Sequence, residues 1–169
     1  GIVLNTIGRL DDAIASYEKA LEINPNYTDS YNNLGIVLKK IGRLDDAISS
    51  YEKSFKINPN DADTYNNLGI AFADLGRLDD AIASYEKALI INPKYAETYN
   101  NLGIIFLKLN RLDYAQKYNE KAIKLKSNFA EAYAAKGRIY TELKQLNKAL
   151  ACLEKVKVIN PSLAYNLGA

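Results

Sequence analysis

The sequence predicts an all-α solenoid of antiparallel helix pairs, and three observations predict it. The 169-residue chain repeats itself every 34 residues, so that residues 29–62 and 63–96 are identical at 22 of 34 positions. Within each repeat, apolar residues recur at the three- and four-residue spacing of a helix face. Glycine and proline stand at fixed points between these stretches, where they end helices. A unit this short cannot bury its apolar face alone, so successive units are expected to stack.

The repeat register follows from residues that recur every 34 positions. These are Pro25, Pro59, Pro93 and Pro161, with Ser127 at the missing place, and Gly1, Gly35, Gly69, Gly103 and Gly137. We predict a single array over residues 1–163, with repeats at about 1–27 (truncated), 28–61, 62–95, 96–129 and 130–163. Residues 164–169 form an out-of-phase tail, because residues 165–168 echo the segment 31–35 at the wrong distance.

The third repeat shows how one unit is built. Residues 62–75 are expected to form a first helix, Gly76 and Arg77 a turn, and residues 78–91 a second helix. Two acids at the start of the second helix favour the positive end of its dipole. Asn92 precedes Pro93, a combination that disfavours further helix. The small Gly69 is expected where two helices approach closely, and Tyr65 and Tyr85 are expected to fill the space between repeats.

Composition excludes several kinds of chemistry. The chain has no His and a single cysteine, Cys152, so it lacks the residues for a His-based triad, a disulfide or a His/Cys metal cluster. It also lacks a glycine-rich phosphate loop. The paired aspartates that recur beside an arginine in successive repeats are expected at exposed helix starts, where they pair locally. We therefore expect no enzyme, no cofactor and no metal.

Charge and hydropathy bear on partners and location. The 22 basic and 20 acidic residues give a net charge of only +2, which argues against nucleic acid as a partner. No apolar run reaches the roughly 20 residues that a membrane span needs, so no membrane insertion is expected. Because no signal-peptide pattern opens the sequence, we expect a cytoplasmic protein.

The repeat also resembles a known family. Its recurring pattern is Tyr65, Leu68, Gly69, Phe72, Ala81, Tyr85, Ala88 and Pro93. This pattern resembles the tetratricopeptide repeat, with Tyr in the place of the usual Trp. The resemblance implies a right-handed superhelical solenoid whose first helices line a concave surface, and a protein-binding scaffold. Departures gather near the end of the chain, where Asn119 replaces the aromatic and Lys136 the leucine.

A pair of asparagines lies in the middle of each first helix until the last repeat. The pairs are Asn32 and Asn33, Asn66 and Asn67, and Asn100 and Asn101. Asparagine is a mediocre helix former, so two in succession indicate a role other than folding. A primary amide can donate to and accept from the backbone of an extended peptide. The arrangement is similar to the asparagine ladder in the repeats of O-linked N-acetylglucosamine transferases. That resemblance makes Asn33, Asn67 and Asn101 the ladder residues. Alternatively, the amides cap or bridge the helices of adjacent repeats.

Two further rows flank the amides on the same helices. Ile36, Ile70 and Ile104 lie about one turn beyond the ladder residues, and Asp29, Asp63 and Glu97 lie one turn before them. Such a groove suits an extended peptide with some apolar and basic side chains. Alternatively, the acids serve only the helix N-termini.

The charge is distributed unevenly along the chain. Residues 1–107 hold ten basic and fifteen acidic side chains, a net of −5, whereas residues 108–169 hold twelve and five, a net of +7. One acidic and one basic end allow head-to-tail self-association, a contact that propagates instead of closing; drift in the last repeat explains the same numbers. The function expected first is a scaffold that binds a protein or extended peptide. The alternatives are a self-associating assembly platform and the substrate-recognition arm of a larger enzyme, such as a glycosyltransferase.

Overall fold

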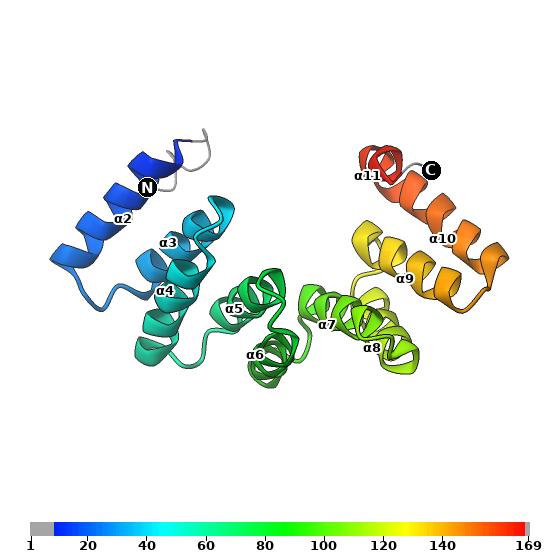
Figure 1. Ribbon diagram of the computed structural model, residues 1–169, viewed down its shortest axis with the longest axis horizontal. Coiled ribbons are helices and arrows are strands. Elements are labelled where there is room, and N and C mark those ends of the chain that lie inside the picture. Colours follow the sequence, from blue (N-terminus) through cyan, green and yellow to red (C-terminus); the bar gives the residue numbers. More distant parts are fainter. Residues whose placement is uncertain (1–8, 168–169) are drawn as a thin grey trace. The chain divides into compact units, whose positions relative to one another are not determined.

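A computed structural model describes residues 9–167 of the chain. In this part the regular structure is entirely helical (Figure 1), which confirms the predicted all-α class. The helices are α2 (Leu10–Ile23), α3 (Thr28–Lys40), α4 (Leu44–Ile57), α5 (Ala62–Asp74), α6 (Leu78–Ile91), α7 (Ala96–Lys108), α8 (Leu112–Leu125), α9 (Ala130–Glu142), α10 (Leu146–Ile159) and α11 (Pro161–Asn166). The start of the truncated first repeat at Gly1 lies outside the described residues.

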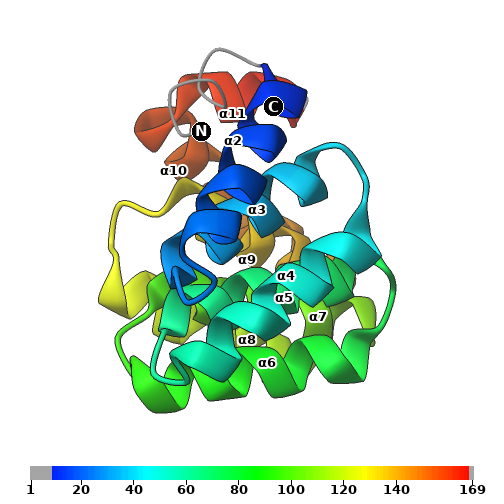
Figure 2. The same ribbon diagram turned by 90° about the vertical axis from the view of Figure 1, so that its left-hand side faces the viewer.

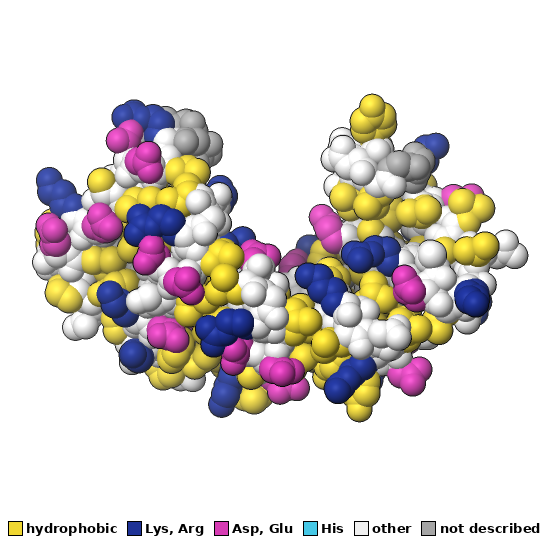
Figure 3. All heavy atoms as spheres, viewed as in Figure 1, with side chains coloured by type: hydrophobic (Ala, Val, Ile, Leu, Met, Phe, Trp, Pro, Cys, Tyr) yellow, Lys and Arg dark blue, Asp and Glu magenta, His cyan; other side chains and the backbone are white. Residues whose placement is uncertain are grey.

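The chain forms two compact units, Gly1–Asn92 and Pro93–Ala169. Unit 1 contains α2 to α6, and unit 2 contains α7 to α11. Unit 1 has nine basic and fourteen acidic residues, a net charge of −5, and unit 2 has thirteen and six, a net of +7. Acidic and basic side chains are nevertheless interspersed on the visible face of unit 1 (Figure 3).

Helices pack as antiparallel pairs within each unit. In unit 1, α3 packs against α4 and α5 against α6; in unit 2, α7 packs against α8 and α9 against α10 (Figures 1 and 2). The helices predicted for the third repeat are α5 and α6. The predicted bounds of the second helix are confirmed, and α5 ends one residue early, at Asp74, with Leu75 as its C-cap.

The turn between paired helices is the same in each described repeat. In the third repeat Arg77 N–H donates to the Phe72 carbonyl at 2.9 Å, and Gly76 N–H donates to Ala73 at 3.1 Å. These two hydrogen bonds form the Schellman motif, which requires a residue in the left-handed backbone conformation after the helix. Gly76 has a φ of 77° and therefore supplies it without steric strain.

A glycine on the first helix lets the paired second helix approach closely. A Cβ added to Gly69 would lie 2.5 Å from Cε1 of Tyr85, and one added to Gly35 would lie 2.5 Å from Cε1 of Tyr51. The expectation that Tyr85 fills the space between repeats is thus corrected, because this ring packs inside its own helix pair. Tyr65 does bridge successive repeats, since its ring stacks on Phe55 at 5.3 Å between centroids.

Unit 2 contains a different packing at the equivalent place. Asn119, which replaces the aromatic residue, is fully buried, and its Nδ2 donates to the Ala132 carbonyl at 2.8 Å. An aromatic residue instead occupies the preceding position, Tyr118. Its ring stacks on that of Phe106, with 5.3 Å between the ring centroids and 3° between the ring planes. The exchange keeps an aromatic ring between the paired helices, but the atoms nearest Gly103 now belong to Ala115 and Asn119.

The short helix α11 begins earlier than the 34-residue register predicts for a first helix. It starts at Pro161, and the Asn160 side chain caps it by accepting a hydrogen bond from Leu163 N–H at 3.0 Å. Ala164 is buried in a cluster with Ala130 and Val156, so α11 lies against the last helix pair. In register with Ala130, a first helix would begin at residue 164.

Candidate functional site

The predicted rows occupy corresponding positions on α3 and α5, which are neighbouring first helices in unit 1. Asp29 and Asp63 are exposed in the first turns of the two helices. Ile36 and Ile70 are half-buried about two turns further on. We call this surface of α3 and α5 the first-helix face; the equivalent positions of unit 2 lie on α7.

A hydrogen bond joins amides from the two first helices of unit 1. Asn67 Nδ2 donates to Asn32 Oδ1 at 3.1 Å, and both side chains are half-buried. This bond is the bridge that the alternative interpretation predicts, formed here between one ladder residue and the neighbour of another. A primary amide carries two donors and an acceptor with two lone pairs, so one bond leaves Asn67 further capacity.

The two asparagines of a pair differ in burial. Asn66 is 6% exposed and Asn100 is 4% exposed, so neither offers much surface to a ligand. Asn100 also lies near Asn119, whose Nδ2 is 3.5 Å from its Oδ1. The ladder positions Asn33, Asn67 and Asn101 are half-buried and keep accessible surface. The series ends on α9, where Ala134 and Ala135 occupy the corresponding positions.

Unit 2 has acidic and apolar residues at the equivalent positions of α7. Glu97 Oε1 accepts a hydrogen bond from Lys126 Nζ at 2.6 Å, and this bond is the main reason that the pKa of the Glu97 carboxyl is lowered. Ile104 is half-buried, like its equivalents in unit 1. The carboxylate of Glu97 is therefore engaged within its own unit.

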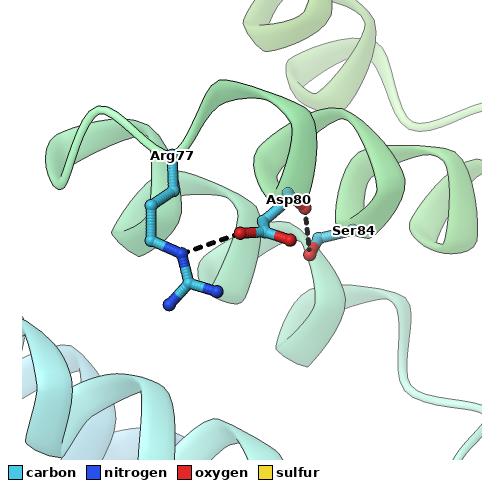
Figure 4. A network of polar contacts seen from close by, with 3 residues as sticks. All are labelled: Arg77, Asp80 and Ser84. Atoms are coloured by element: carbon cyan, nitrogen blue, oxygen red, sulfur yellow. Dashed lines mark hydrogen bonds and ion pairs between the residues drawn. The ribbon is translucent and has the colours of Figure 1, made fainter.

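The paired aspartates form local ion pairs. Arg77 Nε donates to Asp80 Oδ2 at 2.7 Å (Figure 4), and Arg43 does the same to Asp46 at 2.6 Å. About half of each side chain is exposed, so these pairs contribute little to stability. They stand at the starts of second helices, as the sequence predicted.

The remaining features that could bear on function are the Cys152 thiol, metal-binding clusters and membrane-spanning helices. Burial raises the pKa of the Cys152 thiol, although the charge of Lys136 opposes this, so the neutral thiol packs between helices. Among residues 9–167, no three His, Cys, Asp or Glu side chains gather closely enough to hold a metal ion. No helix of the same part combines the length and apolar character needed to cross a membrane.

One concavity in unit 1 was missed by sequence reasoning. It lies between α2, α3 and α4, and its volume is about 440 Å³. The sequence signal that points to it is a size difference between repeats, since Leu21 stands where the next repeat has Phe55. The repeat pattern alone conceals this difference, because both residues are apolar.

Comparisons with known proteins agree with this geometry. A family profile described as TPR repeat matches residues 3–42, 37–76 and 71–110, and profiles described as tetratricopeptide repeat match residues 96–129 and 130–163. No curated protein matches the sequence.

Solved structures with this fold include several repeat proteins. MamA is 29% identical with a TM-score of 0.81, over 96% of this chain and 95% of that one. TTC0263, a thermophilic TPR protein in Thermus thermophilus, is 25% identical with a TM-score of 0.82, over 96% and 89% of the two chains. YrrB, a TPR protein with an unusual peptide-binding site, is 24% identical with a TM-score of 0.72, over 98% and 87%, and shares the fold. The profiles together span residues 3–163, and the chain therefore belongs to the tetratricopeptide repeat family.

Proposed function

We propose that this protein is an interaction scaffold whose first-helix face binds an extended peptide or protein segment. The observation that carries the proposal is that half-buried amides, Asn33, Asn67 and Asn101, recur at the equivalent position of α3, α5 and α7. An amide placed mid-helix lowers helix propensity, and at these positions the side chain keeps accessible surface.

The spacing within a unit suits backbone recognition. Neighbouring packed helices lie about 8–10 Å apart, and an extended peptide advances about 3.3 Å per residue. Asn33 and Asn67 would thus meet the ligand backbone about three residues apart. Ile36 and Ile70 offer apolar contacts beside them, and the exposed Asp29 and Asp63 favour basic side chains at one edge.

Two analogies support this mode of binding. The recurring asparagines resemble the asparagine ladder in O-linked N-acetylglucosamine transferase repeats, and the resemblance implies amides that hold a peptide backbone. YrrB, which shares the fold, is described as having an unusual peptide-binding site. In our proposal the protein acts as a binding partner rather than a catalyst, and it acts in the cytoplasm.

A set of three substitutions tests the proposal. A peptide ligand is first identified by co-purification, and its affinity is measured for the wild type and for Asn33→Ala/Asn67→Ala/Asn101→Ala. Losing three amide contacts of about 1 kcal/mol each should weaken binding by tenfold or more. The control replaces three exposed loop asparagines with alanine: Asn26, Asn60 and Asn128. Equal affinity of both variants and the wild type, with helix content unchanged, would contradict the ladder.

Head-to-tail self-association is the second candidate, and exposed leucines on α10 favour it. Leu150 is 58% exposed, whereas Ile48, at the equivalent position of α4, is only 7% exposed. Leu146, one turn earlier, is 66% exposed, so the two leucines form an apolar edge. Together with unit charges of −5 and +7, this edge supports stacking of copies. Sedimentation at low and high salt tests it, because charge-steered assembly should weaken as ions screen it. A monomer at every salt and protein concentration would contradict this candidate.

A further inference from the structure

The concavity between α2, α3 and α4 lies on the side of α3 that faces away from the first-helix face (Figure 1 locates the three helices). Tyr31 and Leu34 line it from α3, and each precedes a residue of the first-helix face, Asn33 and Ile36, by two positions. Two residues correspond to about 200° around a helix, so the two surfaces are nearly opposite. The concavity is therefore a separate potential binding site, which we call the outer pocket.

The outer pocket lies where one lining side chain is smaller than its equivalent in the next repeat. Leu21 lines it from α2, whereas the next repeat has Phe55 at the equivalent position, with its ring stacked on Tyr65. Tyr31 is the equivalent of Tyr65, so its ring lacks the aromatic cover that Tyr65 has. The resulting concavity is open to solvent and has a volume of about 440 Å³.

A nearly buried serine at the pocket is without a side-chain partner among the described residues. Ser50 is 7% exposed and lines the pocket from α4. Its equivalents Ser16 and Ser84 donate to backbone carbonyls one turn earlier, at 2.7 and 2.8 Å, as Figure 4 shows for Ser84. No such bond is made by Ser50. The Ser50 hydroxyl therefore remains available to form a hydrogen bond with a ligand in the pocket.

Charged groups at the pocket indicate the sign of that ligand. Glu18 and Glu22 lie one turn apart on the same face of α2, and neither forms an ion pair or hydrogen bond within residues 9–167. Lys53 lines the pocket from α4, with its Nζ 5.8 Å from the centroid of the Tyr31 ring. The ring thus already attracts a cation from within the protein, and two carboxylates without a partner among the described residues line the same pocket.

We propose that the outer pocket binds the arginine side chain of a partner protein. A guanidinium group is planar, so it can stack on the Tyr31 ring while its N–H groups donate to the Glu18 and Glu22 carboxylates. The Ser50 hydroxyl oxygen can accept a further bond, and Leu21 and Leu34 pack against the methylene stem. An anionic ligand would face two carboxylates. A lysine ammonium has no planar group to stack and would compete directly with Lys53 for the ring.

The test uses two peptides that differ only in charge. Acetyl-Gly-Arg-Gly-amide and its citrulline counterpart, which is uncharged but similar in shape, are titrated into the isotope-labelled protein, and amide NMR shifts are followed. The arginine peptide should shift residues of α2, α3 and α4. The affinity of the citrulline peptide should be lower by about tenfold or more, because charge-assisted hydrogen bonds are lost. Equal binding of the two peptides, or shifts confined to the first-helix face, would overturn the proposal.

Matched variants follow from the repeats themselves. Leu21→Phe copies Phe55 and should fill the pocket and abolish binding, while thermal melting reports that the protein stays folded. Glu18→Gln/Glu22→Gln changes only half-exposed or exposed polar groups and should weaken binding about tenfold. Lys53→Ala should strengthen it by removing the competing ammonium. Unaltered binding in both of the first two variants would overturn the proposal.

Phe55→Leu is the control for the role of charge. It opens a pocket of similar shape in the next repeat, but Lys56 stands there in place of Glu22. It should therefore create no second arginine site. A new site as strong as the first would contradict the assignment of the carboxylates as the selective groups.

Discussion

Single buried side chains account for some of the stability of each unit. Tyr51 is fully buried against Gly35, and its Oη has no hydrogen-bond partner among the described residues. Tyr85 packs in the same way against Gly69. The rings stabilise the helix pairs through buried apolar surface, whereas an unpaired buried hydroxyl opposes folding.

Tyr51→Phe should therefore raise the free energy of unfolding by about 1 kcal/mol, since it removes the unpaired hydroxyl and keeps the ring. Urea unfolding of the wild type and the variant measures the difference. A variant less stable than the wild type would show that the hydroxyl has a favourable interaction.

The same two tyrosines predict a loss of stability at alkaline pH. Burial, followed by the negative charge of Asp74, raises the pKa of both phenols well above the ordinary value of tyrosine. In the unfolded chain the two tyrosine side chains ionise near pH 10, whereas in the folded protein they stay neutral at that pH. The contribution of the two neutral phenols to the free energy of unfolding is thus fully present below about pH 10 and is lost as the pH rises above it.

Urea unfolding between pH 8 and pH 11, with phenolate absorbance recorded in parallel, measures this effect. The fall in stability above about pH 10 should be smaller in Tyr51→Phe/Tyr85→Phe than in the wild type. Ionisation of all tyrosines together, with structure retained, would contradict the assigned direction of the pKa shifts.

At the scale of helix pairs, the first helix approaches the second at a glycine, and the tightness of this approach varies along the chain. A Cβ at Gly69 would lie 2.5 Å from the Tyr85 ring, whereas one at Gly137 would lie 3.5 Å from Cys152 Cβ, an ordinary contact. The same substitution should thus have opposite effects in the two repeats.

Gly69→Ala should lower the free energy of unfolding by about 1–3 kcal/mol, because the buried ring cannot move away. Gly137→Ala should raise it by about 0.5–1 kcal/mol, through the better helix propensity of alanine. Urea unfolding of both variants measures the contrast. Changes of the same sign in both would contradict the packing described for Tyr85 and Cys152.

Sequence periodicity predicted the helix pairs well because the relevant signals are local. Gly76 and the apolar spacing placed the turn and both helices of the third repeat. The sequence did not predict that Tyr85 packs inside its own pair, because the periodicity does not say which neighbour a ring will contact. It also did not reveal how Tyr118 and Asn119 pack. The Tyr118 ring stacks on Phe106 and the buried Asn119 amide donates to the Ala132 carbonyl, and both contacts depend on the fold.

At the scale of the whole molecule, the repeat pattern predicted the family and the face on which to look for a site. It placed Asn33, Asn67 and Asn101 at equivalent positions of successive first helices but could not tell that Asn66 and Asn100 are buried. Nor could it foresee the outer pocket, since a pocket depends on the volume left by Leu21 among three helices. Burial and cavity volume are properties of packing and are not visible in a spacing pattern.

The central claim is that an extended ligand lies along the first-helix face. A co-purified peptide that carries a photo-reactive group is crosslinked to the protein, and the attachment sites are mapped by mass spectrometry. We expect them on α3, α5 and α7, near Asn33, Asn67 and Asn101. Attachment to α4, α6 and α8 instead, with α3, α5 and α7 unmodified, would contradict the claim.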